Sequence, residues 1–440
     1  MSAEIRPIKT PAEETLAKAF AGAKSALPGD SAVQERRDAA FRRFEANGLP
    51  HRRIEEWKYT DLRSFMRESK PLAGAPGIAA KECAKLAGAT FATVDARRIV
   101  FVDGAFAADL SDLADLEPGL TITSLADALA RGLPSVMAGE PGPAEGDLAF
   151  SLNTALMGDG AVIEVAAGSA IARPLLLVFA FGSDQAVAIF NRSIVRLGAG
   201  ATLTLLESHE GPDGLDYQVN SAIEISVGEG ARLEHIKAGF EGDKSLHVST
   251  VEATLGKDAK YDDFVLASGG AMVRNQFFVK CAGTGIKFGL RGASLLGGSQ
   301  HSDTTLVLDH ASPECESREL FKSVLDGNAR AVFQGKIMVR PGAQKTDARM
   351  MTQALLLSET AEADAKPELE IFADDVQCGH GATVGELDQT LKFYLMARGV
   401  PAKEAEALLI EAFVAEVVDE VAHEGAQDAL RAAISAKLSA

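Results

Sequence analysis

The sequence predicts a mainly β protein, with a β-solenoid in the middle of the chain and a helical region at each end. Two observations lead to this prediction. From about residue 150, short β-branched runs alternate with glycine-rich bends, whereas the first 70 residues and those after 386 show helix-start signals and apolar residues at helical spacing. The chain has 440 residues, of which 47% are hydrophobic and 24% charged, so it has ample material for a core and for more than one structural unit.

The N-terminal helical region is predicted over residues 1–70. Pro11 stands near the first turn of one helix, and Ser31 begins a second one with the capping-box pattern SAVQ, which glycine and proline after residue 47 bring to an end. Trp57 is the only tryptophan of the chain. We expect it to be a packing anchor, with contact to a ligand as the alternative.

A mixed α/β region with linkers is expected over residues 71–147. It contains short strands such as RIVFVDGAF and two stretches rich in glycine and proline, at 71–77 and 132–147. The second stretch is the predicted domain boundary. The β-helix core is then expected over 148–385 and a C-terminal helical region over 386–440.

The glycine-rich bends of the core recur at similar intervals. They are VAAGSAI at 165, LGAGATL at 197, VGEGARL at 227, LGKDAKY at 255 and AGTGIKF at 282, so their starts are 32, 30, 28 and 27 residues apart. Even spacing favours a solenoid, because each coil of a solenoid buries its inner face only against its neighbours. An antiparallel sandwich of ordinary hairpins is the alternative, since glycine suits the bends of either fold.

The C-terminal region contains two predicted helices. Asp388 is the expected N-cap of the first, which ends at Gly399, and Pro401 begins the second. An apolar stripe at helical spacing follows, made of Ala405, Leu408, Leu409, Ala412, Phe413, Val417 and Val421. This stripe either docks on the protein's own body or binds a partner.

Composition and motifs argue against several functions. A formal net charge of −18 disfavours nucleic acid as the main partner. The longest apolar run, PLLLVFAF, is too short to span a bilayer and the N-terminus lacks a secretory signal, so we expect a cytoplasmic protein without membrane contact. No phosphate-binding loop, GxSxG or HExxH motif occurs, so no bound nucleotide and no catalytic residue are expected.

The cysteines give no self-contained metal motif. Cys83, Cys281, Cys315 and Cys378 are scattered without a CxxC pair, which argues against a disulfide framework and against a metal site made by this chain alone. Two segments are nevertheless rich in polar and special residues. They are 308–339, with His310, Cys315 and Glu316, and 343–385, with Cys378 and His380.

The segment FADDVQCGHGATVG, at 372–385, holds the candidate site residues Cys378 and His380. If residues 374–380 are extended, Asp374, Val376, Cys378 and His380 lie on one side, with neighbours about 6.5 to 7 Å apart. At that spacing the thiolate and imidazole suit two irons of a cluster better than a single ion. A cluster takes four protein ligands, so the others would come from a second chain. The alternative is a buried cysteine and a hydrogen-bonded histidine at a turn.

Several segments together resemble one family. They are EEWKYTDL at 55–62, LNTALMGDGAVIEV at 152–165, GKIMVRPGAQKTDA at 335–348, KPELEIFADDVQCGHGATVGELD at 366–388 and FYLMARGVPAKEAEALLIEAF at 393–413. Through them the chain resembles the SufB/SufD family of the SUF iron-sulfur cluster assembly machinery, and the SufD subunits in particular. The resemblance implies a right-handed parallel β-helix with flanking helical regions, which agrees with the glycine spacing.

The resemblance also implies a non-catalytic scaffold that works in a complex. Its β-helix would pair with SufB, with a homodimer possible when SufB is absent, and its C-terminal helices would bind the ATPase SufC. His380, with Cys378 as its neighbour, would lie near a cysteine of SufB and supply a ligand to iron or a nascent cluster that is transient and shared. Relatives can have a serine at the position of Gly379, a difference that leaves the two ligands intact.

The residues expected to bind SufC belong to the C-terminal helices; they are Tyr394, Arg398, Leu408, Leu409 and Phe413. The alternatives to this function are a β-helical carbohydrate-active enzyme, an acyltransferase built on hexapeptide repeats, and the SufB paralogue. Repeats near 27 to 32 residues disfavour the acyltransferase, and one tryptophan with four tyrosines gives little for stacking on sugars. The EEWKYT and CGHGATVG segments and the moderate length favour SufD over SufB.

Overall fold

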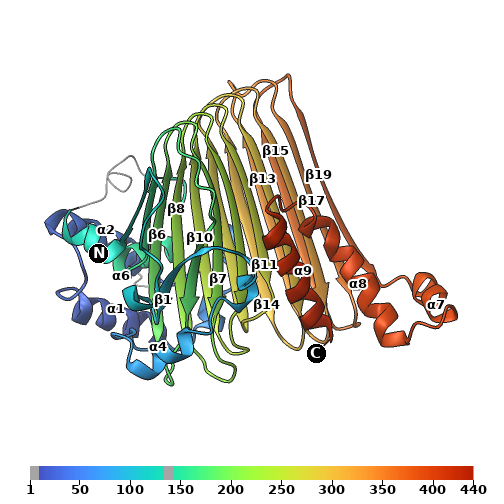
Figure 1. Cartoon of the computed structure of the whole chain (residues 1–440), viewed down its shortest axis with the longest axis horizontal. Coiled ribbons are helices and arrows are strands. Elements are labelled where there is room, and N and C mark those ends of the chain that lie inside the picture. The colour runs from blue at the N-terminus through green and yellow to red at the C-terminus, as the bar shows by residue number, and fades with distance from the viewer. Residues whose placement is uncertain (1–8, 133–141, 440) are drawn as a thin grey trace, which may run out of the picture.

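The computed structural model describes residues 9–132 and 142–439. Within them, two sheets form opposite walls of a solenoid, and consecutive strands from β4 onward alternate between the two (Figure 1). Sheet A contains β3 (Leu120–Ser124), β4 (Ala161–Val165), β6 (Ala188–Leu197), β8 (Gln218–Val227), β10 (Leu246–Leu255), β12 (Met272–Cys281), β14 (His301–His310), β16 (Arg330–Val339) and β18 (Glu362–Ile371). Sheet B contains β2 (Ala105–Phe106), β1 (Arg97–Val102), β5 (Leu175–Ala180), β7 (Thr202–Glu210), β9 (Arg232–Phe240), β11 (Lys260–Ala267), β13 (Lys287–Leu296), β15 (Glu316–Leu325), β17 (Asp347–Leu356) and β19 (Gln377–Glu386).

The parallel β-solenoid predicted from the glycine spacing is confirmed. Each strand from β6 to β19 pairs in parallel with the equivalent strand of the neighbouring coil, which excludes the antiparallel sandwich. Leu197 of β6 pairs with Val227 of β8, and Val227 pairs with Leu255 of β10, so the residues before successive glycine bends stack on one another. Their side chains belong to the core that fills the space between the sheets.

The bends between sheet A and sheet B explain why glycine recurs. Gly200 and Gly230 occupy equivalent places and have φ of 67° and 64°, a left-handed conformation that glycine adopts without steric cost. The next bend has Asp258 there, with φ of 54°. Short polar side chains tolerate this conformation better than others do, so the repeat continues through LGKDAKY.

Both sheets extend upstream of residue 148, where the sequence places the start of the β-helix core. β1 pairs in parallel with β5, and β3 pairs in antiparallel fashion with β4. Residues 97–124 therefore contribute strands to the walls of the solenoid. The glycine- and proline-rich stretch at 132–147 falls partly outside the described residues.

Helices of the N-terminal part of the chain pack on the outer faces of the two sheets, most of them on sheet A. They are α1 (Pro11–Ala23), α2 (Ser31–Asn47), α3 (Leu62–Phe65), α4 (Ile78–Ala84), α5 (Leu125–Ala130) and α6 (Leu148–Leu156). Side chains of α1, α2 and α6 pack with those of β6, β10 and β12, while α4 packs on sheet B. The predicted N-cap of the second helix is wrong by one residue: α2 begins at Ser31, but Asp30 is its cap, because its carboxylate accepts from the Val33 amide at 3.0 Å.

Trp57 is a packing anchor, as expected. It is 1% exposed, its indole N–H donates to Asp147 at 3.0 Å, and the guanidinium of Arg274 from β12 lies 3.9 Å from its ring centroid. Arg274 also donates to the Glu56 carbonyl at 2.7 Å. The EEWKYTDL segment therefore fastens the N-terminal region to sheet A.

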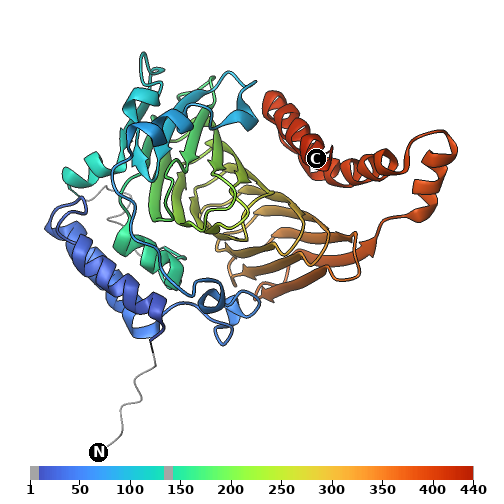
Figure 2. The same cartoon turned by 90° about the horizontal axis from the view of Figure 1, so that it is seen from below.

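The C-terminal helices cover the outer face of sheet B. They are α7 (Gln389–Ala397), α8 (Ala402–Val418) and α9 (Glu424–Ser439). α8 and α9 lie along the solenoid, whereas α7 projects away from it (Figures 1 and 2). None of the described residues of α7 is buried.

The predicted apolar stripe of α8 is only partly correct. Ala405, Val417 and Val421 are buried, but Leu408 is 43% exposed. The inward face is instead centred on Ile410 and Val414, because α8 packs against β13 and β15 along that line. In the described part of the chain no helix is both long and apolar enough to cross a membrane.

Candidate functional site

The candidate site lies at the last coil of the solenoid. β18 and β19 are the final strands of sheets A and B, and in the described residues neither pairs with a strand beyond it. Most residues of these two strands are half-buried or exposed, unlike those of the middle coils. The last coil therefore presents backbone N–H and C=O groups and part of its interior to the outside.

Cys378 and His380 both belong to β19. Cys378 pairs with the fully buried Ala348 of β17 and is half-buried against the core, and His380 pairs with Met350 and is exposed. Ala348 and Met350 are core residues, so the alternating side of β19 that holds Cys378 and His380 continues the interior wall. The structure thus brings the two predicted ligands to the open end of the solenoid.

The expected extended stretch is shorter than the sequence suggested. β19 begins at Gln377, and residues 374 and 375 lie in the preceding bend. Lys345 forms an ion pair with Asp375, and the Asp375 amide donates to Gln344 at 3.0 Å, which fixes this bend. Asp374 is therefore not a member of the row that contains Cys378 and His380.

A cleft of about 770 Å³ adjoins this strand, and its lining includes Cys378 and His380. Three arginines line it too, and Arg318 is held by Asp347 at 2.7 Å. The cleft also reaches Glu319 of β15, which is 2% exposed and has no direct hydrogen-bond partner for either carboxylate oxygen. Burial raises the pKa of Glu319 to about 8.

The two predicted ligands differ in protonation chemistry. Burial raises the pKa of the Cys378 thiol, so this group is protonated at neutral pH and would release a proton on binding a metal. His380 is exposed and can present a ring nitrogen to a group outside the chain. One thiol and one imidazole are fewer ligands than iron or a cluster requires, so further ligands would come from elsewhere.

The residues expected to contact an ATPase partner lie in the exposed C-terminal part of the fold. Tyr394 is 52% exposed and Arg398 stacks on its ring at 4.4 Å. Leu408 is also exposed, whereas Leu409 and Phe413 are half-buried. Phe413 is partly covered by Lys322, whose ammonium lies 4.3 Å from the ring centroid.

The described residues contain two further groups of potential metal ligands; the sequence singles out His310 and Cys315 but does not place them with Cys281. The two groups are Cys281, His310 and Cys315, and His209, Glu241 and His247, and within each group the ligand atoms lie within 4.8 Å of one another. In each group two ligands lie five or six residues apart and the third comes from a neighbouring coil, so no local motif contains all three. The repeat itself contains a signal for the first group. One position of the coil is occupied in turn by Leu197, Val227 and Leu255, and in the next two coils by Cys281 and His310.

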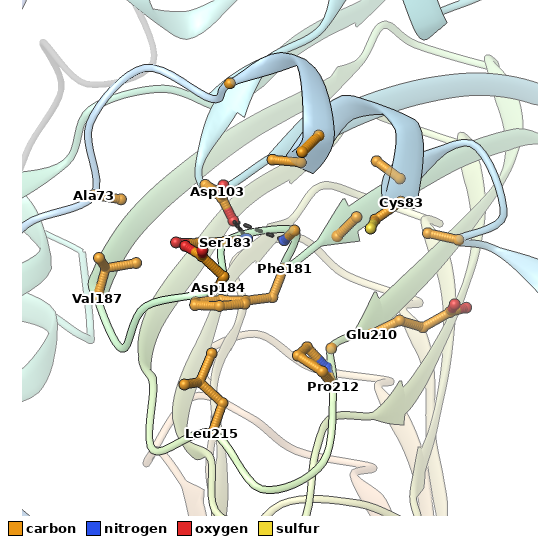
Figure 3. A pocket seen from close by; sticks show the side chains of 18 of the residues that line it. Ala73, Cys83, Asp103, Phe181, Ser183, Asp184, Val187, Glu210, Pro212 and Leu215 are labelled. Carbon is orange, nitrogen blue, oxygen red and sulfur yellow. Dashed lines mark hydrogen bonds between the residues drawn. The ribbon is translucent and has the colours of Figure 1, made fainter.

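A second and larger cleft, of about 920 Å³, lies beside α4 (Figure 3). Asp103 points into it, but its carboxylate accepts from the amides of Gly182 at 2.8 Å and Ser183 at 3.1 Å and so holds the loop after β5. Cys83 of α4 also lines the cleft (Figure 3). Asp103 is committed to the loop, and the ligand groups within 4.8 Å of one another lie elsewhere among the described residues, so we do not place the site here.

Two family descriptions match this chain. Residues 179–413 match "SUF system FeS cluster assembly, SufBD core domain", and residues 11–177 match "SufBD protein N-terminal region". The first covers the solenoid from the end of β5 to α8, and the second covers the N-terminal helices and the first strands.

Individual relatives agree with these matches. The chain is 32% identical to the iron-sulfur cluster assembly SufBD family protein slr0076 of Synechocystis over 420 residues, which cover 93% of this chain and 92% of that one. It is 32% identical to the iron-sulfur cluster assembly protein SufD of Escherichia coli over 394 residues, or 89% and 90% of the two chains. Protein ABCI7 of Arabidopsis thaliana chloroplasts is 27% identical over 94% of this chain and 88% of its own length.

Proposed function

The chain belongs to the SufBD family of iron-sulfur cluster assembly proteins, and we propose that it is a SufD-type scaffold subunit that performs no catalysis itself. The choice of SufD over SufB rests on the EEWKYTDL and CGHGATVG segments and on the 32% identity to the Escherichia coli SufD protein along 90% of its length. The proposed compartment is the cytoplasm.

The observation that carries the proposal is the open last coil with His380 and Cys378 on its interior side. In the proposed complex, SufB pairs with this coil and supplies the missing ligands, so that iron or a nascent cluster is held between the two chains. His380 is exposed and needs no rearrangement to reach a partner. Cys378, which is half-buried two residues earlier in the strand, is a second ligand to the same group.

The proposed contact with the ATPase SufC lies on α7 and the exposed side of α8. Apolar side chains that a monomer would normally bury stand out there, with Phe393 at 70% and Tyr394 at 52% exposure. ATP hydrolysis belongs to SufC in this scheme, and this chain binds no nucleotide.

The test uses the assembled complex. The chain is co-expressed anaerobically with SufB and SufC chains, and the purified complex is analysed for visible absorbance, iron and acid-labile sulfide. We expect His380→Ala to leave the complex intact and to lower its iron and sulfide content several-fold, because the shared group loses a ligand. Thr383→Ala, an exposed change on the opposite side of the same strand, is the matched control.

Unchanged iron and sulfide in the His380→Ala complex would refute the site assignment. A wild-type complex that never takes up iron or sulfide would refute the scaffold role. Loss of the complex itself in His380→Ala would instead assign this residue to assembly of the subunits.

A further inference from the structure

We propose that Cys281, His310 and Cys315 form a buried site for a thiophilic divalent metal ion, zinc or ferrous iron, inside the solenoid of a single chain. The site lies where sheet A turns into sheet B in two successive coils. Cys281 ends β12, His310 ends β14, and Cys315 directly precedes β15. The inference needs no partner subunit and stands apart from the proposed shared site at His380.

The backbone itself brings the three side chains together. Cys281 and His310 are paired residues in the parallel register of β12 and β14, so their side chains point into the core one above the other. The bend after His310 connects sheet A to sheet B and places Cys315 beside both. All three are buried, at 0%, 0% and 1% exposure, and their ligand atoms lie within 4.8 Å of one another.

The hydrogen bonding of this group is incomplete. His310 Nε2 lies 3.2 Å from the Ser317 hydroxyl, but its Nδ1 has no hydrogen-bond partner although the residue is fully buried. A buried polar atom without a partner destabilises the fold, and a bound cation would satisfy it. The Cys315 sulfur lies 3.4 Å from the Gly283 carbonyl and 3.5 Å from the Pro313 carbonyl, both at weak hydrogen-bond distance.

The two cysteines can bind one ion together. Their sulfur atoms and a ring nitrogen of His310 all lie within 4.8 Å of one another. A thiolate is the form of cysteine that binds metal, so a divalent cation would displace the thiol protons of Cys281 and Cys315.

The donor set selects the class of metal. Two thiolates and one imidazole are typical ligands of zinc and of ferrous iron, whereas magnesium and calcium prefer oxygen. Three protein ligands leave a position for water or for a further donor. The buried Glu319 carboxylate, which acts electrostatically on Cys281, is an oxygen donor in the same part of the interior.

The second group of potential ligands, His209, Glu241 and His247, gives weaker support for a metal site. Both ring nitrogens of His247 already have hydrogen-bond partners, Nδ1 with Glu241 and Nε2 with the Ser221 hydroxyl at 2.7 Å. Glu241 Oε2 has no partner, but His247 has no ring nitrogen left for an ion, whereas His310 Nδ1 in the cysteine group is unpaired.

The experiment uses the full chain, purified alone under reducing and anaerobic conditions and titrated with Co²⁺. We expect about one Co²⁺ per chain and a thiolate-to-cobalt charge-transfer absorption, both lost in the double variant Cys281→Ala/Cys315→Ala. Cys378→Ala should keep both, which separates this site from the proposed shared one. Metal analysis after growth with added zinc or iron then tells which ion the cell supplies.

Thermal unfolding gives a second readout that does not depend on colour. Zn²⁺ should raise the Tm of the wild type and of Cys378→Ala but not that of the double variant. If the double variant folds poorly, the single variant His310→Asn takes its place, with the same expected losses. Absence of Co²⁺ binding by the wild type, a charge-transfer band that persists without both cysteines, or a Cys281–Cys315 disulfide under reducing conditions would overturn the proposal.

Discussion

At the scale of single residues, buried ionisable side chains connect separate parts of the fold through hydrogen bonds. Glu252 of β10 accepts a hydrogen bond from the Ala144 amide at 3.0 Å and so ties the segment before α6 to sheet A. Burial, with the neighbouring Glu224 carboxylate, raises the pKa of Glu252 to about 7. The folded chain therefore keeps a proton that the unfolded chain loses near its ordinary pKa of 4.5.

This shift predicts a pH-dependent stability. Between about pH 4.5 and 7 the folded state binds more protons at Glu252 than the unfolded state does, so its contribution to the free energy of unfolding falls as pH rises. Glu252→Gln removes this dependence, because glutamine accepts the same hydrogen bond without titrating. We expect the variant to gain on the order of 1 to 3 kcal/mol over wild type between pH 5 and pH 8.

Urea unfolding at the two pH values measures the effect. Glu359→Gln, an exposed change in the bend between β17 and β18, should show no such gain. Equal differences between Glu252→Gln and wild type at both pH values would contradict the assignment.

At this scale, the sequence predicts features formed by residues close together in one strand. It does not predict those formed when one coil stacks on the next. Cys378 and His380 could be singled out because two ligating residues stand two positions apart in one strand. Cys281 and His310 are 29 positions apart in the register and meet only because one coil lies on the next. Their proximity follows from the length of a coil, which the glycine spacing gives only approximately.

At the scale of elements, the helices and bends were predictable where one residue controls the backbone. Glycine and Asp258 mark the bends through their positive φ, and Asp388 caps α7 as expected, accepting from the amides of Thr390 and Leu391. The buried side of α8 was harder to predict. Its apolar residues surround much of the helix, so the choice between Leu408 and Ile410 depends on packing against sheet B.

A partner protein best explains why α7 exposes its apolar side chains. In a sequence-distant part of the surface, Leu86 is exposed singly, whereas on α7 Leu391, Phe393, Tyr394 and Met396 are exposed together. We expect Phe393→Ser/Met396→Ser to weaken binding of a SufC chain at least tenfold, because apolar area at the contact is lost, and to leave Tm unchanged, because α7 buries no residue in the described structure.

Binding of purified SufC by calorimetry or by co-purification measures this effect. Leu86→Ser is the control, since it removes an apolar side chain that is 81% exposed and belongs to a different part of the fold from α7. This pair of surface changes is a sharper test than removal of residues 386–440, because that deletion would also uncover the face of sheet B that α8 and α9 protect. Unaltered SufC affinity in the double variant would move the ATPase contact elsewhere.

At the scale of the whole molecule, the two outer faces of the solenoid are covered but its last coil is not. N-terminal helices pack on β6, β10 and β12 of sheet A, and the C-terminal helices pack on sheet B (Figure 2). At the last coil, β18 and β19 each expose a ten-residue edge, together with Ile371, Phe372 and Val384. Exposed edges of this length promote association, and natural proteins usually block them.

This asymmetry predicts how the chain associates when it is alone. We expect the purified wild type to form a dimer through the last coil, in which the two edges of one copy face those of another, and SufB to replace the second copy when present. Val384→Lys places a charge on the side of β19 that also holds Cys378 and His380, where Val384 is 53% exposed at the open coil, and should shift the chain to a monomer because lysine at an edge opposes pairing. Sedimentation equilibrium of wild type and variant measures the change, with Leu86→Lys as the control for an added surface charge. If the wild type is a monomer, or if Val384→Lys does not affect its dimer, pairing through the last coil is contradicted. If the variant is monomeric and also fails to bind SufB, the second copy and SufB bind the same edge.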